Sequence, residues 1–252
     1  MKCNNTVTVL LSLHKRQKEF ENQINCLLNQ TKKVDSIMVW CSNYENLTLI
    51  REIEDKYSIQ IKYGITNIPG VWGRFSFALN ADTDFIYIMD DDIFPGPRYI
   101  EECVHKFYEY GGCVISPSGL KFQGTPSSLV GYDRYGWSLY PETEISDHEV
   151  DYGQHGWFFH KQFLPYFWKE LPEDSYSKFA GEDMHLSHMV TKYTDHKTIV
   201  MKHNKDDLDS FANDPRNEAY SLGWDENGIS TIMGIGEMEK ILKQKVKNGW
   251  LR

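Results

Sequence analysis

The sequence predicts an α/β fold in which helices flank a mostly parallel sheet. Two observations carry this prediction. Up to about residue 117, short apolar segments alternate with segments whose apolar residues recur at helical spacing, an order typical of βαβ units. The apolar segment 84–89 then ends in Asp90, Asp91 and Asp92. Open α/β sheets bind ligands at the carboxyl ends of their strands, so this acidic turn lies where a site is expected.

The individual elements follow from local composition. A short run of β-branched and aromatic residues indicates a buried strand, whereas apolar residues three and four positions apart indicate a helix face. Phe20, Ile24 and Leu27 form one such face. Strands are therefore expected over residues 6–13, 36–41, 59–63, 84–89, 112–117, from 157 onward and over 198–202, and helices over 17–29, 47–57, 75–81, 97–110, 182–192 and 237–247.

Two segments lack this periodicity. Residues 119–149 are rich in Gly, Ser, Tyr and Trp, and we expect them to form loops or an irregular antiparallel hairpin. Residues 206–236 are polar and contain several glycines. This composition predicts a mobile lid or a small irregular lobe ahead of the last helix.

The bulk properties exclude several classes of protein. A net charge of −9 over 252 residues argues against a general nucleic-acid-binding surface. The five cysteines are scattered and contain no C-x-x-C, which argues against a disulfide framework and a cysteine zinc site. We therefore expect a reducing compartment, the cytoplasm. The sequence also has no recognisable signal peptide and no apolar segment of membrane-spanning length.

The three aspartates indicate a metal site. Asp90 and Asp92 are two residues apart, so in an extended chain they share a side while Asp91 faces elsewhere. Carboxylates crowded in this way repel one another unless a cation lies between them. Oxygen ligands suit Mg²⁺ or Mn²⁺, which usually share their coordination with phosphates. The alternative is a solvated acidic turn without a ligand.

Further polar residues are expected near the same edge of the sheet. Arg74, after a glycine-rich loop, is either a phosphate ligand or a surface arginine. Glu182 and Asp183 open a helix, where acids also favour the helix dipole without any chemical role. His203 follows the last strand and is either a further metal ligand or structural.

Three further histidines are candidates for a site. His155 lies between two glycines and precedes Trp157, and these two residues are expected to line a pocket. His185 and His188 are spaced i, i+3 on a helix, but no third residue has the spacing of a zinc ligand. We therefore do not expect a metal at that pair.

Taken together, these motifs resemble the GT-A nucleotide-sugar glycosyltransferases of the family 2-like group. The resemblance covers residues 6–204. It rests on Val-Thr-Val-Leu-Leu-Ser-Leu-His-Lys-Arg at 7–16, Leu-Leu-Asn-Gln-Thr at 27–31, Gly-Arg at 73–74, Asp-Asp-Asp at 90–92 and Gly-Glu-Asp at 181–183. The three aspartates alone are weak evidence for this family, but the order and spacing of all five segments are specific.

The resemblance implies a role for each motif. Asp90 and Asp92 would bind Mn²⁺ or Mg²⁺ on the diphosphate of the donor, with His203 as a further ligand, and Asp90 and Asp91 would also lie near the nucleotide. Arg16 and Arg74 would contact the nucleotide. Asp183 would be the general base of an inverting transfer and Glu182 would assist the acceptor. His155 and Trp157 would lie on the acceptor side. A retaining enzyme of the same fold remains open.

The implied partners are a nucleotide-diphosphate sugar, UDP- or GDP-linked, and a glycan or glycoconjugate acceptor. Relatives often carry an aspartate after the second strand to contact the base, but this chain has Ser42 and Asn43 there, which we expect to substitute. The expected domains are a GT-A catalytic domain over 1–205, with a nucleotide-sugar half to about 117 and an acceptor half from about 118, and a C-terminal lid and helix over 206–252.

Two other functions stay open. A sugar-phosphate nucleotidyltransferase is also metal-dependent, but it usually has a glycine-rich phosphate loop near its N-terminus, and residues 12–16 contain no glycine. A non-catalytic carbohydrate-binding module would account for the 14% aromatic content. Such a module has no need of an acidic rim together with a Gly-Glu-Asp helix start.

Overall fold

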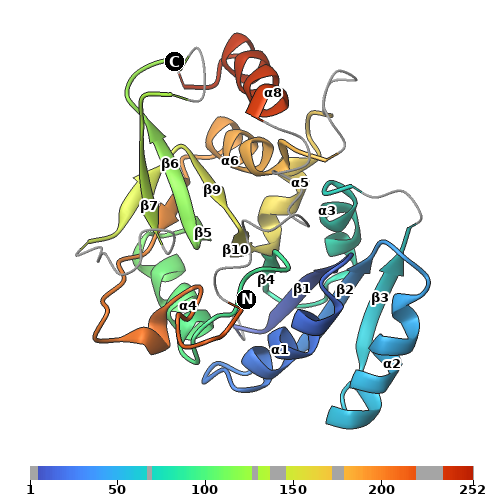
Figure 1. The fold of residues 1–252 in the computed structure, drawn as a ribbon. Coiled ribbons are helices and arrows are strands. Elements are labelled where there is room, and N and C mark those ends of the chain that lie inside the picture. Colours follow the sequence, from blue (N-terminus) through green and yellow to red (C-terminus); the bar gives the residue numbers. More distant parts are fainter. Residues whose placement is uncertain are drawn as a thin grey trace.

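The fold is taken from a computed structural model (Figure 1). The structure describes residues 5–66, 70–126, 130–136, 146–171, 179–219 and 235–251. Part of the predicted lid, residues 220–234, therefore lies outside the described residues.

Within this part of the chain, eight strands form one sheet and three form a second. The strands of the large sheet are β1 (Val7–Leu13), β2 (Ser36–Cys41), β3 (Ile61–Ile65), β4 (Phe85–Met89), β5 (Cys113–Ser116), β8 (His148–Val150), β10 (Gly156–His160) and β11 (Lys197–Val200). Those of the small sheet are β6 (Ser118–Phe122), β7 (Tyr132–Gly136) and β9 (Tyr152–Gln154). The helices are α1 (Gln17–Leu28), α2 (Asn46–Tyr57), α3 (Gly73–Phe77), α4 (Tyr99–Glu109), α5 (Leu164–Phe167), α6 (Glu182–Tyr193) and α8 (Ile235–Lys247).

The large sheet has the strand order β3-β2-β1-β4-β10-β5-β11-β8. Four pairs of neighbouring strands are parallel: β1 with β2, β2 with β3, β1 with β4, and β5 with β11. Helices connect these strands, as parallel pairing requires. The predicted mostly parallel α/β sheet is therefore confirmed.

The centre of the sheet departs from the parallel pattern. β10 lies between β4 and β5 and runs antiparallel to both. Its start, at Gly156, is therefore opposite Met89, the last residue of β4. The sequence identified this aromatic segment as a core strand but not its direction.

Aromatic side chains fill both faces of this centre. Because side chains alternate along a strand, Phe85 of β4 packs with Phe158 of β10 and with Phe107 of α4 on one face. Trp157 packs on the other face against Phe75 of α3, which stacks on Phe167 of α5 at 4.2 Å between ring centroids. The high aromatic content thus serves the core.

The small sheet confirms the predicted hairpin in the 119–149 segment. β6 pairs antiparallel with β7 on one side and with β9 on the other. Leu120 and Tyr152 of this sheet form a second apolar cluster with Met184 of α6 and Ile241 of α8. Figure 1 shows α8 beside α6, at the end of the molecule away from α2.

Candidate metal and substrate site

The acidic turn begins where the buried strand β4 ends. All five residues of β4 are buried, so the chain meets solvent at Asp90. The Asp90 N–H donates to the His155 carbonyl oxygen at 3.0 Å. The Gln23 side chain donates to the carbonyl oxygens of Asp90 and Ile93 at 2.8 and 3.0 Å. These bonds hold the turn against β10 and α1.

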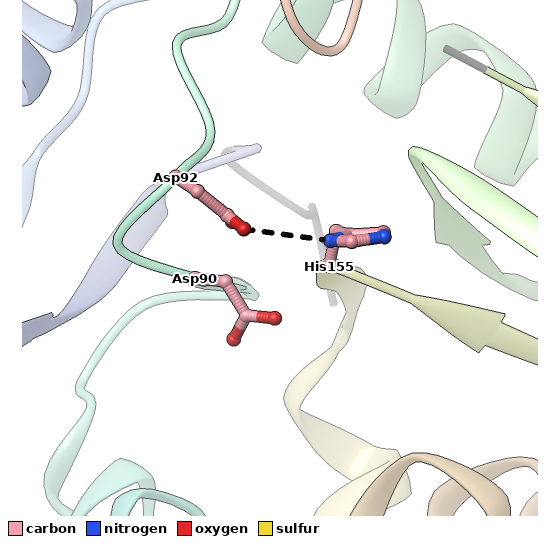
Figure 2. Close-up of side chains that lie close together, drawn as sticks. All are labelled: Asp90, Asp92 and His155. Carbon is pink, nitrogen blue, oxygen red and sulfur yellow. Dashed lines mark ion pairs between the residues drawn. The ribbon is translucent and has the colours of Figure 1, made fainter. Parts of the chain in front are cut away.

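Asp90, Asp92 and His155 bring their side chains together (Figure 2). One ligand atom from each lies within 4.8 Å of the other two, and this is the only such group of acids, histidines or cysteines among the described residues. Asp92 Oδ2 lies 3.8 Å from His155 Nδ1. Its other oxygen, Oδ1, is buried without a hydrogen-bond partner in the described chain. Two carboxylates, an imidazole and a buried free oxygen fit a divalent cation.

The charges of this group act on one another. The pKa of His155 is raised: burial lowers it, but Asp92 more than offsets the burial. The pKa of Asp92 is lowered, because His155 and Arg16 outweigh the effect of its own burial. His155 also adopts a φ of 69°, a left-handed conformation that is uncommon outside glycine and often found at functional sites.

His155, and not His203, is the histidine of this group. A position for His203 beside Asp90 and Asp92 requires that neighbouring strands all end at one rim. β11, which precedes His203, is three strands away from β4, or about 14 Å at the usual spacing. His203 packs edge-on against Phe211, with ring centroids 5.2 Å apart. Because β10 is antiparallel, its beginning lies beside the end of β4, and this brings in His155.

Arg16 and Asp91 form a pair beside the metal group. Arg16 is buried, and its Nη1 lies 2.5 Å from Asp91 Oδ1 and 3.8 Å from Asp92 Oδ2. Burial raises the pKa of Asp91 to about 7, although Arg16 acts against this rise. Asp91 thus lies outside the group of Asp90, Asp92 and His155, and it binds an arginine of the same chain.

Arg74 links two of the predicted site segments. Its guanidinium is buried, forms an ion pair with Asp90 and donates to Glu182 Oε1 at 2.7 Å. The same guanidinium lies over the Trp157 ring, 4.9 Å from the centroid. Arg74 is therefore not the surface arginine of the alternative interpretation.

Trp157 does not line the acceptor side, contrary to the expectation from the sequence. Only 1% of its surface is exposed. Its indole N–H donates to the Gly153 carbonyl oxygen at 3.1 Å, and its ring packs against Phe75 and Arg74. The Trp157 ring therefore packs beneath the Arg74 guanidinium and exposes no surface that an acceptor could contact.

Glu182 and Asp183 open α6 as predicted. Gly181 precedes them with a φ of 89°, and a Cβ there would lie 2.8 Å from Ile241 of α8. Glycine is thus required by both the turn and the packing. Burial raises the pKa of Asp183 well above its ordinary value, and the adjacent Glu182 adds to this rise. Burial also raises the pKa of Glu182, while Arg74 opposes it.

The expected base-binding residues, Ser42 and Asn43, directly follow β2. Ser42 Oγ lies 2.5 Å from His14 Nδ1, and burial and the neighbouring Lys15 lower the pKa of His14. The Asn43 carboxamide is bound to Glu45, through the Glu45 backbone N–H and its side chain. Ser42 is therefore bound to His14, whereas the Asn43 side chain is bound to Glu45, just before the start of α2.

Arg74→Met is expected to destabilise the protein strongly. The change leaves Glu182, whose side chain is 8% exposed, without its buried cation, which typically costs about 3–5 kcal/mol. Urea unfolding measures the loss. The double variant Arg74→Met/Glu182→Gln removes both charges and should recover part of it. A single variant as stable as the wild type would contradict the described pairing.

No protein-family model and no curated protein matches this sequence. Solved structures do match. They include S. aureus TarS 1–349, with 14% identity, a TM-score of 0.54 and coverage of 81% of this chain and 61% of that one. The same protein in complex with UDP-GlcNAc gives 15% identity and a TM-score of 0.54, with coverage of 79% of this chain and 56% of that one. The mannosyltransferase PcManGT from Pyrobaculum calidifontis, in complex with GDP-Man and Mn²⁺, matches with 14% identity and a TM-score of 0.52. This match covers 76% of this chain and 56% of that one.

The chain has the α/β fold of these glycosyltransferases. This confirms the predicted fold class, and at 14–15% identity the likeness extends to the fold alone. The chain spans about three fifths of the length of the TarS structure. Within the described residues, no helix is both long and apolar enough to cross a bilayer.

Proposed function

We propose that this protein is a metal-dependent glycosyltransferase that moves a sugar from a nucleotide-diphosphate sugar to an acceptor hydroxyl. The observation that carries the proposal is the convergence of Asp90, Asp92 and His155 at the end of β4. Arg74 links Asp90 to Glu182, the residue before Asp183 at the start of α6. The fold and its match to glycosyltransferase structures support the same conclusion.

Asp90, Asp92 and His155 are the proposed metal ligands. A bound Mn²⁺ or Mg²⁺ would offset the negative charge that develops on the diphosphate as the sugar leaves. The mannosyltransferase structure with GDP-Man and Mn²⁺ supports this choice of ion. Arg74 forms an ion pair with Asp90, which helps to fix this proposed ligand.

Asp183 is the proposed general base. An acceptor hydroxyl is a poor nucleophile at neutral pH, and a carboxylate within hydrogen-bond distance takes its proton during attack. Burial and Glu182 raise the pKa of Asp183, which brings its proton affinity toward that of an effective base. Glu182 is bound to Arg74, so of the two acids Asp183 is the one available to the acceptor.

The transfer then proceeds with inversion. The acceptor oxygen bonds to the anomeric carbon as the bond from that carbon to the diphosphate oxygen breaks, and the acceptor proton passes to Asp183. A single base opposite the leaving group performs one displacement. The donor is a UDP- or GDP-sugar, in line with the UDP-GlcNAc and GDP-Man complexes of the similar structures, and the acceptor is a glycan or glycoconjugate.

A thermal-shift screen of nucleotides and nucleotide-sugars, with and without Mn²⁺, tests the donor site. A ligand that binds only the folded protein raises its melting temperature. We expect a Mn²⁺-dependent rise with UDP or GDP and with one of the corresponding sugars. The absence of a shift with any nucleotide would overturn the proposal.

His155→Ala tests the choice of histidine. Removal of a metal ligand should raise the Mn²⁺ concentration that the thermal shift requires by at least about tenfold. His203→Ala is the matched control and should leave it unchanged, because His203 lies outside the metal group. If His203→Ala lost the shift and His155→Ala kept it, the original expectation from the sequence would be correct.

A further inference from the structure

The negative charge of the proposed site exceeds what its own arginines offset. Asp90, Asp91, Asp92 and Glu182 lie around Arg16 and Arg74, and each arginine is already bound to two of these carboxylates. Neither guanidinium is therefore available as an unpaired cation for the nucleotide. A divalent ion brings two charges, and a nucleoside diphosphate adds at least two negative charges of its own. A further cation near the metal group would offset part of the charge that a nucleoside diphosphate adds.

Arg134 of β7 is on the face of the small sheet that meets α6. It pairs with Leu120 of β6, which pairs in turn with Tyr152 of β9. Residues paired across strands point to the same face of a sheet. Leu120 and Tyr152 pack against Met184, the residue after Asp183. Tyr152, Leu120 and Arg134 thus form one row across the small sheet, and this row lies on the face toward the start of α6.

Arg134 is half-buried and has no hydrogen bond or ion pair to any residue that the structure describes. Its charge nevertheless acts on the site: it lowers the pKa of His155, opposing Asp92. Burial raises the pKa of Tyr152, Asp183 adds to this rise, and Arg134 opposes both. The guanidinium thus lies within electrostatic reach of a proposed metal ligand.

We infer that Arg134 binds the diphosphate of the donor and holds the charge of the leaving group. This inference rests on the proposed function. The planar guanidinium donates two parallel hydrogen bonds to phosphate oxygens, a geometry that lysine cannot reproduce. When the bond between the anomeric carbon and the β-phosphate oxygen breaks, the electron pair stays on that oxygen, and Arg134 stabilises the resulting negative charge.

Binding of uridine and guanosine nucleotides to wild type and Arg134→Gln, in Mn²⁺, tests the inference by calorimetry. We expect UDP or GDP to bind about 10- to 100-fold more weakly to the variant, the usual cost of a lost charged hydrogen bond. The matching monophosphate, which lacks the β-phosphate, should lose much less. The ratio of diphosphate to monophosphate affinity is unaffected by a loss of stability alone, so it separates the two causes. Arg134→Lys should fall between wild type and Arg134→Gln.

Lys121→Gln is the matched control. It removes one positive charge from the same sheet, but Lys121 lies on the opposite face, next to Leu120 in sequence, and is bound to Asp151 and Glu149. Its diphosphate affinity should equal that of the wild type. An unchanged ratio in Arg134→Gln, with normal binding by the wild type, would overturn the role of Arg134. If the wild type bound no nucleoside diphosphate, the proposed function itself would fail.

Discussion

Asp183→Asn is expected to abolish most of the transfer activity and yet to stabilise the protein at neutral and alkaline pH. Loss of the proposed general base should lower kcat by about 10²- to 10⁴-fold. The side chain keeps its shape, and its oxygen can still accept from the Met184 N–H, as Asp183 Oδ1 does at 2.7 Å. The variant therefore separates the charge of Asp183 from its place in the fold.

The gain in stability follows from the raised pKa of Asp183. A group whose pKa is higher in the folded than in the unfolded state contributes stability at low pH, and this contribution is lost as the pH rises through the folded-state pKa. Asparagine does not ionise, so it avoids that loss. The melting temperatures of the two proteins should be similar at acidic pH and should diverge as the pH rises, with the variant higher.

Melting curves from pH 5 to pH 8.5 without metal, together with single-turnover rates, measure both effects. Asp133→Asn is the control for the chemical change, because Asp133 is an exposed aspartate of β7, and it should alter neither quantity. A variant that kept its activity, or that was less stable than the wild type at pH 8.5, would contradict the assignment of Asp183 as a buried base.

Asp92→Asn is the second large effect. Asp92 is 7% exposed, and one of its oxygens has no hydrogen-bond partner in the described chain while the other faces His155. Loss of this carboxylate should weaken Mn²⁺ binding by at least about 100-fold, beyond the usual effect of changing a residue that only supports a ligand. The Mn²⁺-dependent binding of nucleotide should be lost with it.

Asp91→Asn provides the matched control one residue away. Asp91 is bound to Arg16 and lies outside the metal group, and asparagine can still accept from the guanidinium. Manganese titrations by paramagnetic relaxation, without nucleotide, compare the two variants directly. Equal losses in both would mean that the turn binds cations only through its total charge, and the site described here would be wrong.

The N-terminal part of the fold, up to β5, was predictable because its structure is local. The alternation of strands and helices up to β5 follows from hydrophobic periodicity, and boundaries shifted by only a few residues, as in β3, which begins at Ile61 instead of residue 59. The position of the three aspartates after β4 follows from the same pattern. Glu182 and Asp183 were found because a Gly-Glu-Asp segment precedes a helix.

The remaining site residues depend on strand direction and pairing, which single-sequence patterns do not encode. His155 joins Asp90 and Asp92 because β10 runs antiparallel beside β4. The alternation of side chains along β10 is the same in either direction, so the sequence pattern does not reveal the direction. Arg134 faces α6 because β7 pairs with β6 in one register, and a shift of one residue would turn it to the other face. The glycines on both sides of His155 were the available signal that this residue occupies an unusual backbone position.

Phosphorus NMR of the purified protein with Mn²⁺, a nucleotide-sugar that shifts its melting temperature and a panel of glycan acceptors tests the central claim most directly. The account predicts that the nucleotide-sugar is converted to nucleoside diphosphate, with the sugar recovered on an acceptor, and that Asp183→Asn does neither. Formation of nucleoside triphosphate and sugar 1-phosphate on addition of pyrophosphate would instead identify a nucleotidyltransferase. That result, or binding without conversion of any nucleotide-sugar, would contradict the proposed transfer.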